Sequence, residues 1–122
     1  MIREFLAKFG KQRVLVLGDI MLDHYIWGKV ERISAEAPVP VLEAQKEEFR
    51  LGGAANAALN VKSLGGDAIL LGVTGRDSAA QDLKRLMECK GLATDGLIDD
   101  PDRKTTLKTR IVATNQQIVR ID

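Results

Sequence analysis

Two uninterrupted apolar runs, combined with two helical patterns, constrain the fold of this 122-residue chain most strongly. Residues 13–17 read Arg-Val-Leu-Val-Leu, and residues 68–73 read Ala-Ile-Leu-Leu-Gly-Val. Such runs are typical of strands that are buried on both faces of a parallel sheet. Helices are predicted over about 54–64 and 78–90, so that strands and helices alternate along the chain. The sequence therefore predicts an α/β fold with right-handed crossovers.

The ends of the predicted helices carry recognisable signals. Residues 2–9 predict a short amphipathic helix that ends at Gly10, because apolar residues recur at positions 2, 5, 6 and 9. Ser78 and Gln81 fit a capping box at the start of the last helix, and Gly91 fits its C-terminal end. A weak third strand is predicted over 96–98.

The segment from residue 25 to residue 51 has a different pattern. Residues 25–30 are β-prone, Pro38 and Pro40 favour an extended connection, and residues 41–49 carry many charges. Prolines and charges are typical of protected edge strands. Residues 105–113 and 117–122 predict a second hairpin. We interpret 25–51 as a small antiparallel excursion that could be a flap over a site, a dimer surface or a solvated hairpin.

The composition indicates which binding partners and which cellular compartment to expect. The formal net charge of +1 gives no reason to expect nucleic acid or a membrane as a partner. Cys89 is the only cysteine, so no internal disulfide can form, which fits a reducing compartment such as the cytoplasm. We expect Cys89 to be buried and inert, and the single histidine, His24, to lie in a turn. One Cys and one His cannot form a usual four-ligand zinc site, and no metal site is predicted.

Small and acidic residues follow the predicted strands. In Gly52-Gly53-Ala54-Ala55-Asn56, two glycines precede a helix whose first N–H groups lack internal partners, which favours an oxygen-rich or anionic ligand. The same stretch also fits a tight turn into an alanine-rich core helix. Asp19 and Asp23 follow the first strand, where a carboxylate can bind ligand hydroxyls, hold a metal or cap a turn. Asp77 is a weaker candidate of the same kind.

Several common catalytic motifs are absent. The chain contains no G-x-x-x-x-G-K-[ST] phosphate loop, no G-x-G-x-x-G after either strand and no G-x-S-x-G elbow. The residues therefore predict ligand contacts at strand ends without a complete catalytic set.

Taken together, these stretches resemble the N-terminal portion of a ribokinase-like (PfkB) carbohydrate kinase, with heptose-7-phosphate kinases as the most similar subfamily. The Gly-Gly…Asn signature marks the broad family, whereas the Ala-Pro-Val-Pro and Asn-Gln-Gln stretches narrow the resemblance to the heptose-kinase subfamily. Ala35 is one departure, since the subfamily more often has proline there. The matching stretches are residues 18–23 with Tyr25 and Gly28, 32–34, 36–41, 52–56 with Ala58 and Asn60, 64–65, 72–75 with Asp77, 108–110, and 115–117 with Arg120 and Asp122.

The resemblance implies an incomplete parallel sheet flanked by helices and a small antiparallel β-lid, with lid strands at about 25–51 and 105–122. Lid strands in this family often pair between two subunits, which implies a homodimer. Asp23 and Asn56 would hold sugar hydroxyls, with Asp19 nearby, and Gly52 and Gly53 would allow close backbone approach. The cations Arg32, Lys108, Arg110 and Arg120 are candidates for the substrate phosphate, or else lie on solvated strand faces.

The family's catalytic Asp belongs to a later D-T-x-G-A-G-D motif, which does not occur in residues 1–122. The resemblance thus implies that 1–122 is the N-terminal, sugar-binding part of one kinase domain, without a catalytic residue. ATP and Mg²⁺ would serve the intact enzyme and bind this chain poorly. The implied reaction is ATP-dependent phosphorylation of D-glycero-D-manno-heptose 7-phosphate at O1, in the biosynthesis of ADP-heptose, a precursor of the lipopolysaccharide core. A kinase for another sugar and a non-catalytic sugar-phosphate-binding or dimerisation module are the alternatives.

Overall fold

The computed structural model describes residues 1–122, which divide into two units. Unit 1 consists of Met1–Leu22 and Leu51–Thr106, and unit 2 consists of Asp23–Arg50 and Leu107–Asp122. No helix has the length and apolar character needed to span a membrane. The elements, in chain order, are α1 (Ile2–Phe9), β1 (Arg13–Leu17), β2 (Ile20–Ile33), β3 (Pro40–Gly53), α2 (Ala54–Ser63), β4 (Asp67–Thr74), α3 (Ser78–Cys89), β5 (Leu97–Asp99), β6 (Thr106–Ala113) and β7 (Gln116–Ile121).

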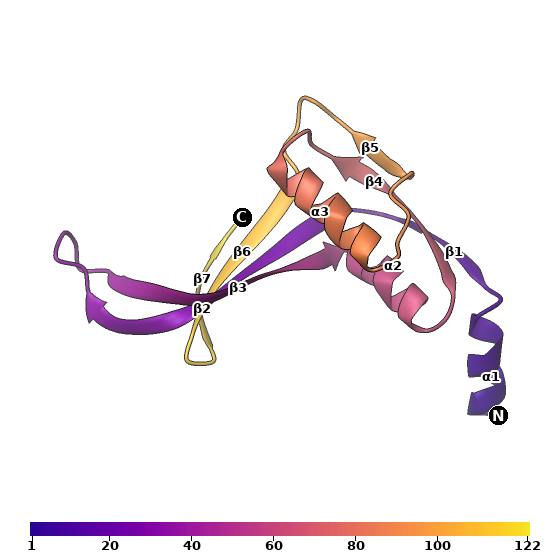
Figure 1. The fold of residues 1–122 in the computed structure, drawn as a ribbon, viewed down its shortest axis with the longest axis horizontal. Coiled ribbons are helices and arrows are strands. Elements are labelled where there is room, and N and C mark those ends of the chain that lie inside the picture. The colour runs from indigo at the N-terminus through magenta and orange to yellow at the C-terminus, as the bar shows by residue number, and fades with distance from the viewer. The chain divides into compact units, whose positions relative to one another are not determined.

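Unit 1 contains a three-stranded parallel sheet in the order β1-β4-β5 (Figure 1). In the register, Leu15 lies beside Ile69, and Val73 lies beside Ile98. The helix α2 packs on β4 and β1. This arrangement confirms the α/β fold and the parallel sheet that the alternation of strands and helices predicts.

The two faces of this sheet differ in burial. Burial alternates along β4, so that Ala68 and Leu70 are buried while Ile69 is exposed. The residues buried with them are Ala55 and Ala58 of α2 and Ala80, Leu83 and Met87 of α3. One face of the sheet therefore belongs to the core of unit 1.

The opposite face is apolar and exposed, which corrects the prediction that residues 13–17 are buried on both faces. The side chains of Leu15, Leu17 and Ile98 are 58%, 78% and 62% exposed, respectively. The strand β1 lies at the edge of the sheet, and within residues 1–122 no helix covers this face. An apolar run predicts what a strand can bury, but the elements around the strand decide whether it is buried.

The helix ends agree with the sequence signals except at the start of α3. Gly10 and Gly91 follow α1 and α3 as predicted, and Gly91 has φ +72°. The N-cap of α3, however, is Asp77 and not Ser78, because the Asp77 carboxylate accepts the Ala80 N–H at 2.9 Å. Cys89 is exposed, contrary to expectation, because it lies two residues beyond Met87 and thus off the buried stripe.

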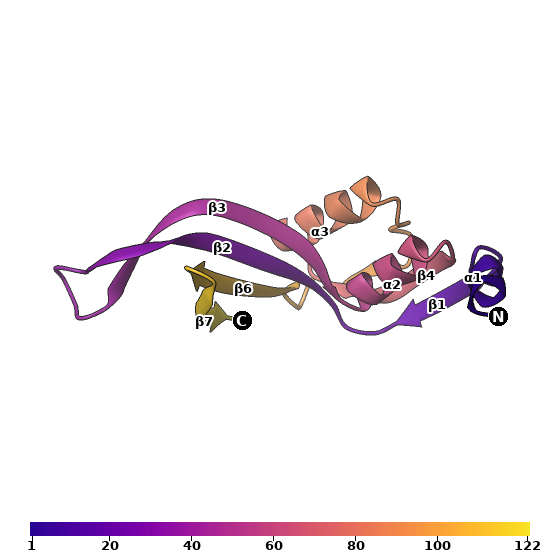
Figure 2. The ribbon, with the colours of Figure 1, turned by 90° about the horizontal axis from the view of Figure 1, so that it is seen from below.

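Unit 2 is a four-stranded sheet in the order β3-β2-β6-β7. The strands β2 and β3 have 14 residues each and form a long, curved pair that extends past β6 and β7 (Figure 2). The strands β6 and β7 are antiparallel, and Thr114 and Asn115 between them have φ of 48° and 67°. Two consecutive positive φ values are typical of a tight hairpin turn. The antiparallel sheet that the sequence predicts is confirmed.

Candidate functional site

The first group of predicted site residues lies in unit 1, around the glycine turn. Gly53 has φ +56°, and a Cβ at this position would collide with the carbonyl oxygen of Asp19 and lie 2.9 Å from Cε of Met21. The same Asp19 carbonyl accepts the N–H of Ala54 at 2.8 Å. The turn therefore requires glycine at position 53 and holds the backbone of Asp19 against the start of α2.

Two predicted site residues are exposed at and near the first turn of α2. No side chain caps this helix, and Asn56 in its first turn is exposed. The Asp19 side chain is also exposed and forms no hydrogen bond within the chain. The Asn56 amide and the Asp19 carboxylate together offer both donors and acceptors, as a polyhydroxylated ligand requires. The structure thus groups Asp19, Gly52, Gly53 and Asn56 in unit 1.

The second group lies in unit 2, where Asp23 of β2 contacts Arg110 of β6. Nη1 of Arg110 donates to Oδ1 of Asp23 at 2.7 Å, and their side chains are only 21% and 17% exposed. This hydrogen bond is the largest cause that raises the pKa of Arg110 above its ordinary value, against the opposing effect of burial. A charge pair that is mostly removed from water is stronger than an exposed one.

Aromatic rings and further cations lie on the same face. The rings of Tyr25 and Trp27 stack with centroids 5.2 Å apart. The guanidinium carbons of Arg50 and Arg110 lie 4.8 Å and 5.3 Å from the Tyr25 centroid, and Lys46 Nζ lies 4.9 Å from that of Trp27. These contacts are within cation–π range.

Arg50 also forms an ion pair with Glu48, with Nε 2.8 Å from Oε1. The hydrogen bonds from Arg50 and then Lys46 lower the pKa of the Glu48 carboxyl. Sequence reasoning did not single out Arg50. The signal that could have found it is the alternation of charge at positions 46, 48 and 50, which places all three on one face of a strand.

The remaining predicted cations divide into two places. Arg120 of β7 lies directly opposite Arg110 and pairs with Asp122 at 3.0 Å, and Lys108 lies two residues before Arg110 on the same face of β6. Arg32 is nine residues from Asp23 along β2, a distance of roughly 30 Å in an extended strand. The structure therefore brings Asp23, Lys108, Arg110 and Arg120 to one region and leaves Arg32 apart.

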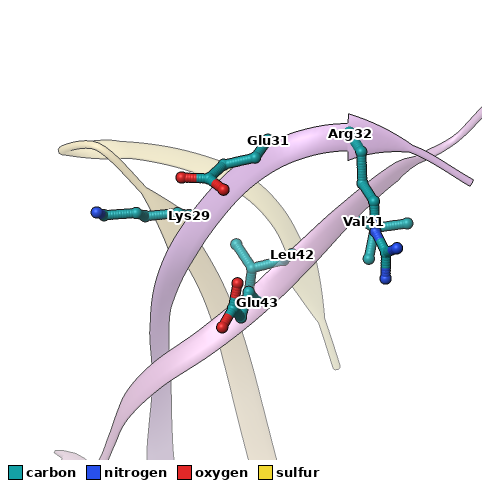
Figure 3. Close-up of a pocket in the computed structure, with 6 residues that line it drawn as sticks. All are labelled: Lys29, Glu31, Arg32, Val41, Leu42 and Glu43. Carbon is teal, nitrogen blue, oxygen red and sulfur yellow. The ribbon is translucent and has the colours of Figure 1, made fainter.

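Arg32 lines a separate surface pocket of about 630 Å³ in unit 2. Figure 3 shows its lining, contributed by β2 and β3, which includes the carboxylates of Glu31 and Glu43 as well as two cations. The strands approach closely here, since a Cβ at Gly28 would collide with the Glu43 carbonyl. Mixed charge gives this pocket less preference for an anion than the face around Arg110 has. Its lining residues are Lys29, Glu31, Arg32, Val41, Leu42 and Glu43.

The lone histidine lies on the opposite face of β2, in a strand and not in the expected turn. The His24 ring stacks on Phe49 at 4.3 Å, and its Nδ1 lies 3.4 Å from Oγ1 of Thr109. Its Nε2 lies 3.3 Å from Oε2 of Glu47 but forms no hydrogen bond there. His24 thus contacts both neighbouring strands and has a bracing role.

Asp77, the weaker ligand candidate, has a structural role as well. Its Oδ1 accepts from Ala80 N–H and its Oδ2 from Thr105 N–H, at 2.9 Å and 2.8 Å. Both carboxylate oxygens are therefore already engaged within unit 1. No group of three or more His, Cys, Asp or Glu side chains is arranged to hold a metal ion anywhere in the chain.

The chain thus combines an α/β unit that contains a glycine turn with an antiparallel sheet that contains a carboxylate–guanidinium pair. The chain belongs to the pfkB family of carbohydrate kinases, whose sequence model, "pfkB family carbohydrate kinase", matches residues 11–122. The fold and the family thus agree.

Two relatives show the extent of the similarity. The chain is 51% identical over 111 residues to "Bifunctional protein HldE" of Helicobacter pylori strain P12, covering 91% of this chain and 24% of that protein. It is 46% identical over 121 residues to the protein of the same name from Citrifermentans bemidjiense, covering 99% and 25%. The chain therefore spans about a quarter of the length of the curated relatives it matches.

Solved structures have the same fold. A carbohydrate kinase from Agrobacterium tumefaciens superposes with a TM-score of 0.71 at 22% identity, covering 90% of this chain and 34% of that one. A ribokinase from Cryptococcus neoformans, solved in complex with ADP, superposes with a TM-score of 0.62 at 25% identity, covering 90% and 34%. The ribokinase-like fold is thus confirmed.

Proposed function

We propose that residues 1–122 form the N-terminal, sugar-binding and lid part of one kinase domain. The intact enzyme phosphorylates D-glycero-D-manno-heptose 7-phosphate at O1 with ATP, in ADP-heptose biosynthesis in the cytoplasm. Support comes from the identity of 46–51% to proteins named HldE and from the heptose-kinase-like stretches at residues 36–41 and 115–117.

One observation carries the proposal at the level of geometry, namely the contact between Asp23 and Arg110. A carboxylate accepts hydrogen bonds from sugar hydroxyls, whereas a guanidinium binds phosphate oxygens in a planar, bidentate manner. The two groups lie 2.7 Å apart on one face of the sheet. A phosphorylated sugar needs both kinds of partner close together, and a sugar without phosphate does not need the guanidinium.

The residues of unit 1 have a complementary role in this proposal. Asn56 binds sugar hydroxyls, Asp19 assists it, and Gly52 and Gly53 permit the approach. Lys108 and Arg120 add positive charge near the phosphate. Arg32 lies apart from these residues, and its phosphate contact stays a prediction.

In this proposal the chain's own residues bind and orient the sugar. ATP supplies the phosphoryl group in the intact enzyme, with Mg²⁺ as its counter-ion, and residues outside 1–122 hold both. Phosphoryl transfer depends on positioning and charge stabilisation around these groups. We therefore expect no ATP turnover by residues 1–122 alone.

A homodimer through the lid is part of the same proposal. Unit 2 exposes apolar side chains on its last strand, where Ile118, Val119 and Ile121 are 42%, 44% and 55% exposed. Exposed apolar side chains on a strand favour association with a second surface. Light scattering of the purified protein measures the oligomeric state directly. A monomer at micromolar concentration contradicts the proposed homodimer.

The function is tested by measuring ATP turnover with a panel of sugars and sugar phosphates, using the protein at its natural length and residues 1–122 in parallel. We expect the natural-length protein to prefer heptose 7-phosphate and residues 1–122 to be inactive. Preference for another sugar overturns the substrate assignment. Turnover by residues 1–122 overturns the assignment of a non-catalytic part.

A further inference from the structure

We infer that Arg50 and Arg110 together form the binding site for the phosphate group of the sugar substrate, with the ring of Tyr25 as their common support. This inference rests on the proposed function and adds Arg50, a residue to which the sequence motifs assign no role. It assigns the phosphate to one face of the sheet β3-β2-β6 in unit 2.

Both arginines contact the same ring. Because their guanidinium carbons lie 4.8 Å and 5.3 Å from the Tyr25 centroid, the two carbons are at most about 10 Å apart. A phosphate that accepts from both guanidinium groups needs their carbons within about 8 Å of each other, a separation that this upper limit allows. Arg50 comes from β3 and Arg110 from β6, so the site joins two strands on either side of β2.

Both guanidinium groups have donors to spare. Arg50 uses only its Nε, for Glu48, and Arg110 uses only one Nη1 hydrogen bond, to Asp23. The terminal nitrogens of Arg50, and Nε and Nη2 of Arg110, have no acceptor in the chain. The ion pairs and the ring contacts hold the planar groups in place, which lowers the entropic cost of binding.

The charge of this face favours a dianion. Each arginine has one carboxylate partner, but additional cations on the same face lack a matching number of acidic groups. An excess of positive charge around a bound phosphate stabilises it and steers it to the site. The cations are Lys46, Arg50, Lys108, Arg110 and Arg120, and the carboxylates are Asp23, Glu48 and Asp122.

The competing explanation is that Arg50 only braces the sheet through Glu48 and the aromatic rings. A bracing residue affects stability and any ligand alike, whereas a phosphate-binding residue affects only ligands that carry phosphate. The two explanations therefore differ in which ligand responds to a substitution at position 50.

The experiment uses the protein at its natural length and measures calorimetric affinity for heptose 7-phosphate and for the same heptose without phosphate. We expect R50Q to weaken the affinity for the phosphorylated sugar by about 10-fold to 100-fold. The affinity for the unphosphorylated sugar should change by less than about 2-fold. R50K retains the charge and should lose less. R13Q is the matched control, because Arg13 pairs with Asp67 on an exposed surface of unit 1.

The inference is overturned if R50Q weakens the affinity for both sugars equally, or weakens the affinity for neither. The proposed function can fail separately. If the wild-type protein ignores heptose 7-phosphate but binds another sugar phosphate with the same response to R50Q, the heptose assignment falls and the arginine site stands. If the wild-type protein binds no phosphorylated sugar, both fall.

Discussion

The Asp77 carboxylate binds the backbone of Thr105, 28 residues later in the chain, with Oδ2 2.8 Å from the Thr105 nitrogen. Thr105 is buried, and its Oγ1 accepts the N–H of Gly75 at 2.9 Å. Because Oδ1 of Asp77 also caps α3, one side chain joins the start of a helix to the residue that precedes β6. This contact closes unit 1 at the point where the chain leaves it.

Replacing Asp77 therefore tests how much its contacts with Ala80 and Thr105 stabilise unit 1. We expect D77A to lower the free energy of unfolding by about 2–3 kcal/mol, because it removes an N-cap and leaves the buried Thr105 N–H without a partner. D77N should cost less, since asparagine retains an acceptor and caps helices well. Urea denaturation gives both values, and a loss below about 0.5 kcal/mol for D77A contradicts this account.

The pH dependence of stability gives an independent check on the same residue. Burial raises the pKa of Asp77, but hydrogen bonds from the backbone of Thr105 and Ala80 outweigh it, so that the pKa falls below 3.8. A lowered pKa means that the charged form stabilises the fold above pH 3.8 and that this contribution disappears as the pH falls through the folded-state pKa. The stability difference between wild type and D77N should thus be constant near neutral pH and shrink in acid.

The control for this pH series is D102N, since Asp102 is exposed and its side chain forms no hydrogen bond. Its stability difference from wild type should stay small at every pH. A wild-type advantage over D77N that grows as the solution is acidified has the wrong sign and contradicts the assignment.

Gly53 is the position where the glycine turn is most sensitive to substitution. G53A places a Cβ against the Asp19 carbonyl and forces alanine to adopt φ +56°, so we expect a loss of about 2–3 kcal/mol in unfolding free energy. G10A is the matched control, because Gly10 has φ −62° and room for a Cβ 3.6 Å from the nearest atom. Equal stability of the two variants in urea denaturation argues against a strained turn.

Local signals in the sequence predicted most of the fold and only part of the site. The parallel pairing of residues 13–17 with 67–71 follows from apolar runs, and the end of α3 follows from Gly91. The exposure of Leu15 and Leu17 could not be predicted, since burial depends on neighbouring elements. The pair of Asp23 and Arg110 joins residues 87 positions apart, and no local pattern specifies such a contact.

The energetic coupling between Asp23 and Arg110 is the remaining prediction. Because both side chains are about four-fifths buried, a double-mutant cycle of D23N and R110Q should give an interaction energy of about 1–3 kcal/mol. Trp27, the only tryptophan and a neighbour of Tyr25, reports the unfolding of this sheet by fluorescence. The comparison pair is Arg13 and Asp67, at 3.1 Å but 75% and 61% exposed, where the coupling should stay below about 1 kcal/mol. Equal coupling in the two pairs means that burial does not strengthen the contact between Asp23 and Arg110.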